Sequence, residues 1–252
     1  QYKKIIFEGT DSSQIEVDLA IPKSNIKGVI IDFPEFKVKN KDYLNLTKYS
    51  MLGYALASLH IRGQAGNSEN NTPYSHFPFL DSSSSTPYFN LVFQDALDTI
   101  SIIEKLFPNK EILVTGLGQG AAISIVCASY YDSIKELFIS DCSLCDIINT
   151  YNNNKKSSFF KNIYKFESDF SDKIDHLYST LNSIDVLNFS NSIRQKVHYG
   201  LSYLDPKTPI KTQLKLLDTL QNVEIQHYKF LDYKKIFQHH FDDYILEVLS
   251  NK

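Results

Sequence analysis

A tight glycine turn between a strand-like run and a helix-like run constrains the fold of this chain more than any other feature. The turn reads Gly116-Leu117-Gly118-Gln119-Gly120. A strand-like run over 111–115 precedes it, and a run of small and apolar residues over 121–128 follows it. Glycine adopts positive φ angles and permits the close backbone approaches that a sharp turn needs. The sequence therefore predicts that a buried strand passes directly into a helix here.

Strand patterns and helix patterns alternate along most of the chain, as in proteins whose parallel sheet is covered by helices. Segment 147–189 differs, because it has a helical period, is rich in Asn, Lys, Ser, Asp and aromatic residues, and contains no clear strand. We predict one α/β domain over 1–252: a doubly wound, mostly parallel sheet with helices on both faces and a small helical cap insertion over 147–189. Ligands of such sheets bind beyond the carboxyl ends of the strands. The predicted strands are 4–7, 14–21, 28–33, 55–61, 111–115, 136–141, 196–201 and 223–228, and the predicted helices around the sheet are 42–52, 91–106, 121–128, 209–220 and 237–250.

The composition is sufficient for a hydrophobic core and argues against nucleic acids and membranes as partners. Of 252 residues, 42% are hydrophobic and 22% are charged, and the net charge is -3. Such a chain has no basic excess for nucleic acid or an anionic membrane surface, and no apolar run reaches the ~18 residues of a membrane span. We expect neither nucleic acid nor a membrane as partner. The given sequence opens with polar residues 1–4, which do not resemble a secretory signal. Three cysteines cannot all pair with one another, which favours a reducing compartment. We therefore expect a cytoplasmic location.

The chain offers no convincing pattern for a metal or a cofactor. Cys142 and Cys145 form a C-x-x-C pair without a second pair or a thioredoxin-like setting, so a buried pair is favoured over a redox or metal role. His239 and His240 are adjacent, and neighbouring residues of a helix point about 100° apart, which does not suit a shared metal ion. There is no Walker loop, and the glycine turn lacks the later glycine of a dinucleotide fingerprint. We predict no metal and no cofactor.

Several segments occur in an order and context typical of one known family. They are Gly53-Tyr54, RGQAGNS at 62–68, the glycine turn, DCSLCD at 141–146, TLNSIDVLNF at 180–189 and Gly200-Leu201. Over most of the chain, they resemble the acetyl xylan esterase / cephalosporin C deacetylase family of α/β-hydrolases. The resemblance implies the α/β-hydrolase fold and the removal of acetyl groups from carbohydrate esters by a Ser-His-Asp triad.

The resemblance also implies a degenerate nucleophile elbow. In the family the turn reads G-x-S-Q-G, and this chain has Gly118 at the serine position. Glycine has no hydroxyl with which to attack a carbonyl, and Thr115 and Ser124 nearby do not lie at the tip of the turn. The family's oxyanion donors are the backbone N–H groups that correspond to Gln119 and Phe36. Glu35, next to Phe36, would bring a negative charge to that place.

The acid and base positions of the family are altered as well. The acid position falls on Tyr203, and Asp205 takes the acid role if a short insertion shifts the loop, or caps a turn if not. The histidine position falls on Tyr233 or Lys234. His239 is the alternative base if that loop is shifted, or a surface residue in the first turn of the final helix if not.

Two further residues of the RGQAGNS segment correspond to family residues that brace the loops around the site. They are Arg62 and Gln64. Arginine binds carboxylates and carbonyls through a planar fork, which favours a structural role for Arg62. The long polar segment 67–88 either lines a pocket or packs on its own side chains.

Two functions from different classes follow from these observations. The first is a catalytically inactive esterase scaffold that acts as a binding or interaction protein. The alternative is an active carbohydrate deacetylase with a rearranged site, and a structural subunit of a larger assembly is a third interpretation. The expected ligand is a small acetylated sugar or another small molecule. A homo-oligomer or a protein partner is compatible with each interpretation.

Overall fold

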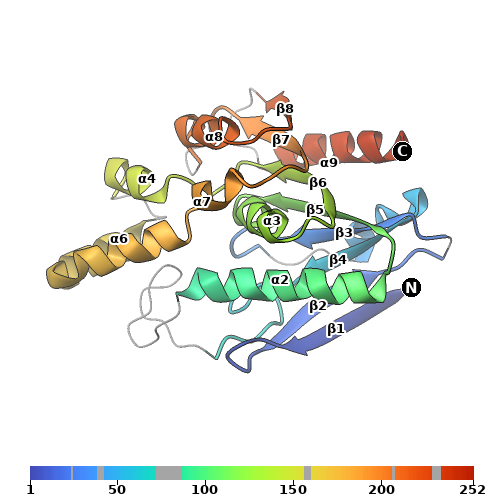
Figure 1. The fold of residues 1–252 in the computed structure, drawn as a ribbon, viewed down its shortest axis with the longest axis horizontal. Helices are drawn as coiled ribbons and strands as arrows, with labels where there is room; N and C mark the ends of the chain where they lie inside the picture. Colours follow the sequence, from blue (N-terminus) through green and yellow to red (C-terminus); the bar gives the residue numbers. More distant parts are fainter. Residues whose placement is uncertain (24, 39–42, 72–86, 156–159, 206–207, 229–233) are drawn as a thin grey trace.

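The computed structural model describes residues 1–252 apart from 24, 39–42, 72–86, 156–159, 206–207 and 229–233 (Figure 1). Within the described residues, eight strands form one sheet in the order β1-β2-β4-β3-β5-β6-β7-β8. The strands are β1 (Tyr2–Glu8), β2 (Gln14–Ala20), β3 (Gly28–Phe33), β4 (Tyr54–Leu59), β5 (Glu111–Leu117), β6 (Ile134–Ser140), β7 (Lys196–Ser202) and β8 (Val223–Tyr228).

The sheet is mostly parallel, as predicted. β2 pairs antiparallel with β1 and β4, and every other pair of neighbouring strands is parallel. All residues of β3 and β4 are buried, as expected of parallel strands covered on both faces. Parallel pairing of β3, β5 and β6 brings their carboxyl ends to one edge of the sheet, and the glycine turn lies at that edge.

Helices cover both faces of the sheet, which confirms the doubly wound arrangement. They are α1 (Tyr43–Thr47), α2 (Tyr88–Leu106), α3 (Gln119–Tyr130), α8 (Ile210–Leu217) and α9 (Lys234–Ser250), with the short 3-10 helix η1 (Ser50–Leu52). Successive residues of a strand point to opposite faces, so Val29 and Ile31 of β3 join the core on the side of α2 and α3. Ile30 joins a second core with Phe241 and Leu249 of α9. Figure 1 shows α2 and α3 together on the near face.

Between β6 and β7 the described chain forms helices. They are α4 (Ile147–Asn153), α5 (Lys161–Asp169), the 3-10 helix η2 (Ser171–Lys173), α6 (Ile174–Ser183) and α7 (Leu187–Ser190). The Asp185 carboxylate accepts hydrogen bonds from the backbone N–H groups of Asp146 at 3.1 Å and Ile147 at 2.9 Å, where α4 begins. It accepts another from Leu187 at 3.1 Å, where α7 begins. Burial raises the pKa of this carboxyl, although its backbone donors act in the opposite direction. One side chain therefore joins the two ends of this helical insertion, and Figure 1 shows α4 and α6 extending beyond the sheet.

A polar network joins the C-terminal segment to β6 and β7. His198 Nε2 lies 3.0 Å from Glu136 Oε2, and His198 Nδ1 lies 2.6 Å from the Tyr244 hydroxyl. Lys252 Nζ donates a hydrogen bond to Glu136 Oε1 at 2.7 Å. The hydrogen bond from His198 is the largest cause that lowers the pKa of the Glu136 carboxyl to about 2. This carboxylate is therefore ionised throughout the neutral and mildly acidic range.

Several helix boundaries differ from the sequence prediction. α9 begins at Lys234 instead of Phe237, so the backbone of His239 lies in its second turn instead of its first. α2 begins at Tyr88, whose buried ring packs edge-on against Phe89 with ring centroids 5.3 Å apart. The pattern over 42–52 gives α1 and η1 instead of one helix. No helix in the described ranges is long and apolar enough to cross a membrane.

Candidate functional site

Gly118 lies at the tip of a sharp turn between β5 and α3. Its φ of 59° and ψ of -111° are unfavourable for residues with a side chain. Its N–H donates to the carbonyl oxygen of Ser140 at 3.0 Å, at the end of β6. Its own carbonyl oxygen accepts a hydrogen bond from the N–H of Ser143 at 3.1 Å. The turn is thus fixed against the carboxyl end of the neighbouring strand.

The two flanking glycines allow α3 to approach the sheet closely. A Cβ at Gly120 would lie 1.8 Å from the carbonyl oxygen of Phe33 at the end of β3. A Cβ at Gly116 would lie 2.2 Å from the carbonyl carbon of Gly120. Both distances are far below van der Waals contact. These positions therefore exclude every residue except glycine while the backbone keeps this path.

The side chain of Glu35 lies directly over Gly118. A Cβ at Gly118 would be 3.2 Å from Glu35 Cγ and 3.7 Å from Glu35 Oε1. Glu35 begins a turn in which the N–H of Val38 donates to its carbonyl oxygen at 3.0 Å, with Lys37 at φ 58°. The Glu35 side chain would therefore be in direct contact with a side chain at Gly118. It also lies near the N-terminus of α3, whose helix dipole favours a negative charge.

Buried and half-buried amides and hydroxyls form a chain of hydrogen bonds that links the turn to Arg62. Gln119, 2% exposed, is the first residue of α3, and its side-chain oxygen accepts a hydrogen bond from Gln64 Nε2 at 2.7 Å. Gln64 Nε2 also donates to the Tyr88 hydroxyl at 2.9 Å, which donates to the carbonyl oxygen of Arg62 at 2.7 Å. Gln64 Oε1 accepts the N–H of Lys37 at 2.8 Å. Gln64 therefore links the turn that carries Glu35 to the turn that carries Gly118.

Arg62 is fully buried and anchors this chain of contacts. Its Nε donates to Asp95 Oδ2 at 2.6 Å and a terminal nitrogen donates to Asp95 Oδ1 at 2.8 Å. The other terminal nitrogen donates to Asp11 Oδ2 at 2.7 Å. Burial raises the pKa of the Asp95 carboxyl to about 6, while Arg62 acts in the opposite direction. Asp95 is therefore ionised at neutral pH and forms a forked ion pair with Arg62.

The structure places the residues at the predicted acid position at the end of β7. Tyr203 is 40% exposed, and its hydroxyl lies 2.9 Å from His227 Nδ1 on β8. Its side chain therefore contacts the neighbouring strand at the surface. Asp205 follows two residues later and is half-buried. Its role as the acid stays a prediction.

The predicted base positions fall largely outside the described structure. Tyr233 belongs to the segment 229–233, and the backbone of His239 is helical within α9, but its side chain is not described. Of the hydroxyls near the turn, Ser124 is fully buried and donates to the carbonyl oxygen of Gly120 at 2.8 Å. The Ser124 hydroxyl is thus engaged inside α3.

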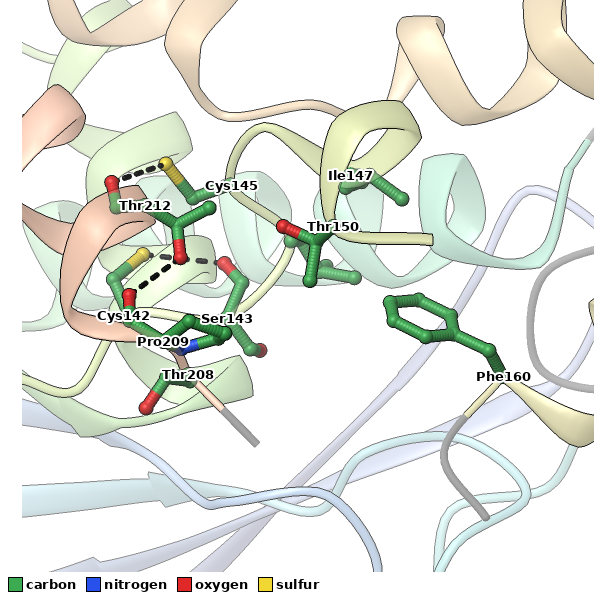
Figure 2. Close-up of a pocket in the computed structure, with 10 residues that line it drawn as sticks. Cys142, Ser143, Cys145, Ile147, Thr150, Phe160, Thr208, Pro209 and Thr212 are labelled. Carbon is green, nitrogen blue, oxygen red and sulfur yellow. Dashed lines mark hydrogen bonds between the residues drawn. The ribbon is translucent and has the colours of Figure 1, made fainter. Parts of the chain in front are cut away.

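A small hollow with a cavity volume of about 20 Å³ lies beside the turn, and sequence reasoning did not identify it (Figure 2). Ser143 lines it and at the same time donates its N–H to Gly118, so the hollow adjoins the turn. Its walls come from the segment after β6, from α4 and from the start of α8. The lining residues are Cys142, Ser143, Leu144, Cys145, Ile147, Thr150, Phe160, Thr208, Pro209 and Thr212. No sequence motif marks Thr150 or Thr208 as members of one site, because only the fold brings α4 and α8 together.

Among the described residues, Glu16, Asp18 and His60 place their ligand-type atoms within 4.8 Å of one another. His60 Nε2 lies 2.9 Å from Asp18 Oδ2, and His60 Nδ1 accepts the N–H of Asn67 at 2.9 Å. Lys4 Nζ donates to Glu16 Oε1 at 2.6 Å. These hydrogen bonds already use the atoms that a metal would need, and Lys4 supplies the balancing positive charge. The cluster is therefore a largely buried polar network between β2 and the residue that follows β4.

Solved structures share this fold, which is the α/β-hydrolase fold. Acetyl xylan esterase 1 from a Thermoanaerobacterium species matches with a TM-score of 0.83 and 18% identity, over 95% of this chain and 82% of that chain. An acetyl xylan esterase from a Paenibacillus species matches with a TM-score of 0.80 and 15% identity, over 96% and 88%. An acylaminoacyl peptidase from Pyrococcus horikoshii matches with a TM-score of 0.71 and 16% identity, over 98% of this chain and 40% of that chain.

The family follows from the sequence match. The acetyl xylan esterase (AXE1) family model matches residues 1–251, and the chain belongs to this family. No curated protein sequence gives a significant match. The resemblance inferred from the short segments is therefore confirmed.

Proposed function

We propose that this member of the acetyl xylan esterase family has lost ester hydrolysis and uses the retained scaffold to bind a small ligand. The position of Glu35 carries the proposal: a Cβ at Gly118 would lie 3.2 Å from its Cγ. Where the family has a nucleophile, this chain has a carboxylate above a glycine. Negative charge develops on the carbonyl oxygen during ester hydrolysis, and the Glu35 carboxylate would repel it.

Two further features support the loss of hydrolysis. Glycine relieves the strain that a serine would have at φ 59°, so it is a favourable replacement once no nucleophile is required. Tyr203, at the family's acid position, contacts His227 at the surface. Each change alone would weaken a Ser-His-Asp triad, and together they support a binding function.

Hydrolysis of p-nitrophenyl acetate tests the proposal. We expect the wild-type protein to be no faster than buffer. We also expect Gly118→Ser to restore no turnover, because the acid and base positions are altered and Glu35 still lies over the turn. The variant with both Gly118→Ser and Glu35→Gln is the matched control for the carboxylate. Wild-type turnover well above buffer that falls in Asp205→Asn would overturn the proposal.

One observation favours the alternative, an active deacetylase with a rearranged site. Ser143 lines the hollow and adjoins Gly118 through its N–H, so its hydroxyl is the candidate for a substitute nucleophile. In that case the wild-type protein would release acetate from acetylated xylose, and Ser143→Ala would abolish the release. Equal rates for both proteins and buffer would exclude this alternative.

A further inference from the structure

We propose that β1 is an interaction surface for a second copy of this chain, whose own β1 pairs antiparallel with it across a two-fold axis at Ile6. β1 is an edge of the sheet, with β2 as its neighbour. Figure 1 shows it at the outer margin of the sheet. β2, β4 and β3 separate it from β5 and the glycine turn. The inference is therefore independent of the proposed loss of hydrolysis.

The backbone of β1 offers hydrogen-bonding groups to a partner strand. The Gln1 nitrogen donates to the Ile21 carbonyl oxygen at 2.6 Å, and the Ile21 N–H donates to the Gln1 carbonyl oxygen at 2.7 Å. Bonded pairs alternate along an antiparallel ladder, and the register of β1 with β2 is continuous. The N–H and C=O groups of Lys4, Ile6 and Glu8 therefore point away from β2. Within the described ranges, no other element hydrogen-bonds to them.

The side chains of β1 complement one another in the pairing centred on Ile6. In this register, Lys4 of each copy lies opposite Glu8 of the other copy, and Ile6 lies opposite itself. Opposite charges directly across an antiparallel pair attract, and like charges repel. On the other face of the strand, Ile5 lies opposite Phe7, and both of these side chains already pack against the main hydrophobic core. The pairing thus extends the sheet and its apolar face together.

Other registers of the same pairing lose this complementarity. If the axis moved to Ile5, Lys4 would lie opposite Ile6, and Glu8 would lie opposite Tyr2. Neither charge would then have a partner across the strand pair. A slip of one strand by a single residue would place the two apolar faces on opposite sides of the sheet. The charges and the apolar face therefore select the axis at Ile6.

The exposed side chains of β1 are available for these contacts. Ile6 is 60% exposed, and its burial at the axis would remove apolar surface from water. Glu8 accepts a hydrogen bond from the Ser12 hydroxyl at 2.8 Å and forms no ion pair in the described part of the chain. The Lys4 side chain pairs with Glu16 at 2.6 Å and stays 44% exposed. An ammonium group has three donors, so Lys4 can bind a second carboxylate while it keeps Glu16.

The other edge of the sheet lacks this complementarity. β8 reads VEIQHY, and its one carboxylate, Glu224, already pairs with Lys196 of β7 at 3.0 Å. β8 contains no lysine or arginine, so two copies of it cannot form reciprocal Lys–Glu pairs. Long edge strands are templates for pairing, and lysines at an edge usually oppose it. In β1, the spacing of Lys4 and Glu8 makes the lysine favourable in one register.

Sedimentation velocity of the full chain at increasing concentrations tests the inference. We expect a reversible monomer–dimer equilibrium with a dissociation constant on the order of 10 μM, because one strand per copy forms a small interface. Glu8→Lys places like charges opposite Lys4 at both ends of the pairing, and we expect it to weaken the dimer at least about 10-fold. Glu247→Lys is the matched control, since it makes the same change of charge at an exposed position of α9.

Two results of this measurement would overturn the inference. The first is a monomer at every concentration. The second is a dimer that Glu8→Lys and Glu247→Lys affect equally, because the interface would then lie elsewhere on the molecule. Ile6→Lys provides a further check that leaves Lys4 and Glu8 in place, and we expect it to weaken the dimer at least as much as Glu8→Lys. Met51→Lys is its control, since Met51 is 96% exposed and lies in η1.

Oxidative cross-linking tests the register. In Ile6→Cys, the two thiols would face each other, with Cα atoms ~5.5 Å apart, a separation that a disulfide spans. Diamide would take up their two protons and two electrons as the disulfide forms. In Lys3→Cys the two thiols would lie about 20 Å apart along the strands, and the native cysteines are buried. We expect a covalent dimer from Ile6→Cys alone. Cross-linking of both variants, or of neither, would overturn the axis at Ile6.

Discussion

The glycine turn contains three glycines that are present for two different reasons. Gly116 and Gly120 are fixed by packing, since a Cβ there would overlap backbone atoms at 2.2 Å and 1.8 Å. Gly118 has only a flexible side chain over it, with Glu35 Cγ at 3.2 Å. The first two positions belong to the frame of the fold, and the third lies at the centre of the candidate site. We therefore expect substitutions in the frame to be far more damaging than a substitution at the centre.

Gly120→Ala is expected to have the largest effect. Its methyl group would overlap the Phe33 carbonyl oxygen, so α3 would have to move away from the sheet. We expect the free energy of unfolding to fall by more than about 4 kcal/mol, or the protein to be insoluble. Chemical denaturation checks this, and Gly63→Ala, at another positive φ but outside the turn, is the control. A soluble and stable Gly120→Ala protein would show that packing does not require glycine at this position.

Arg62→Leu is expected to be nearly as damaging. It would leave the buried Asp95 carboxylate without its forked partner, and breaking one side of a buried ion pair costs about 3–5 kcal/mol. Lys4→Met is the control, because its ion pair with Glu16 is at the surface and such pairs contribute about 0–1 kcal/mol. Urea denaturation of both variants measures the difference. Equal stability losses would show that burial of the pair is unimportant.

Acid should lower the free energy of unfolding through protonation of Glu136. Its folded-state pKa of about 2 lies below the ordinary value of 4.5, so its contribution is present above about pH 4.5 and is lost as the pH falls toward 2. We expect a loss of about 1–2 kcal/mol over this window, after allowance for solvent screening. Unfolding free energies at several pH values measure it. In Glu136→Gln, stability should fall less between pH 5 and pH 2, and an identical pH dependence would contradict the assignment.

Gly118→Ala should have the smallest effect, in contrast to Gly120→Ala. A side chain at φ 59° costs about 1 kcal/mol, and Glu35 must move by only a few tenths of an ångström. The same substitution combined with Glu35→Ala separates backbone strain from the contact with Glu35. A loss as large as that of Gly120→Ala would mean that Gly118 also belongs to the frame.

The overall fold was predictable from the sequence because local sequence patterns determine it. The glycine turn, the buried strands and the family segments fixed the parallel sheet, the helices on both faces and the family itself. Helix starts were less accurate, because Tyr88 begins α2 through burial against Phe89 and not through a capping residue. The antiparallel strand β2 was expected from its alternation of apolar and polar residues.

The candidate site was only partly predictable from sequence. Gly118, Gln119, Arg62 and Gln64 follow from family segments, since these residues lie next to recognisable glycines. The position of Glu35 over Gly118 depends on the relative position of the turn after β3 and the turn after β5. No local sequence pattern determines this relative position. The hollow was missed for the same reason. Thr150 and Thr208 have no distinguishing sequence pattern, and only the fold places both at the same hollow.

Asp185 fixes the two ends of the helical insertion to each other. Because its carboxylate holds the first residues of α4 and the first residue of α7 together, the ends of the insertion stay at a fixed separation whatever lies between them. The entropy of closing such a segment changes only slowly with its length. Loop closure alone would therefore permit changes in length, but Ile163 and Phe166 of α5 and Leu177 and Leu181 of α6 belong to the same buried core as β6 and β7. The insertion is thus closed at its base by one carboxylate and held along its length by the apolar core that it shares with the sheet.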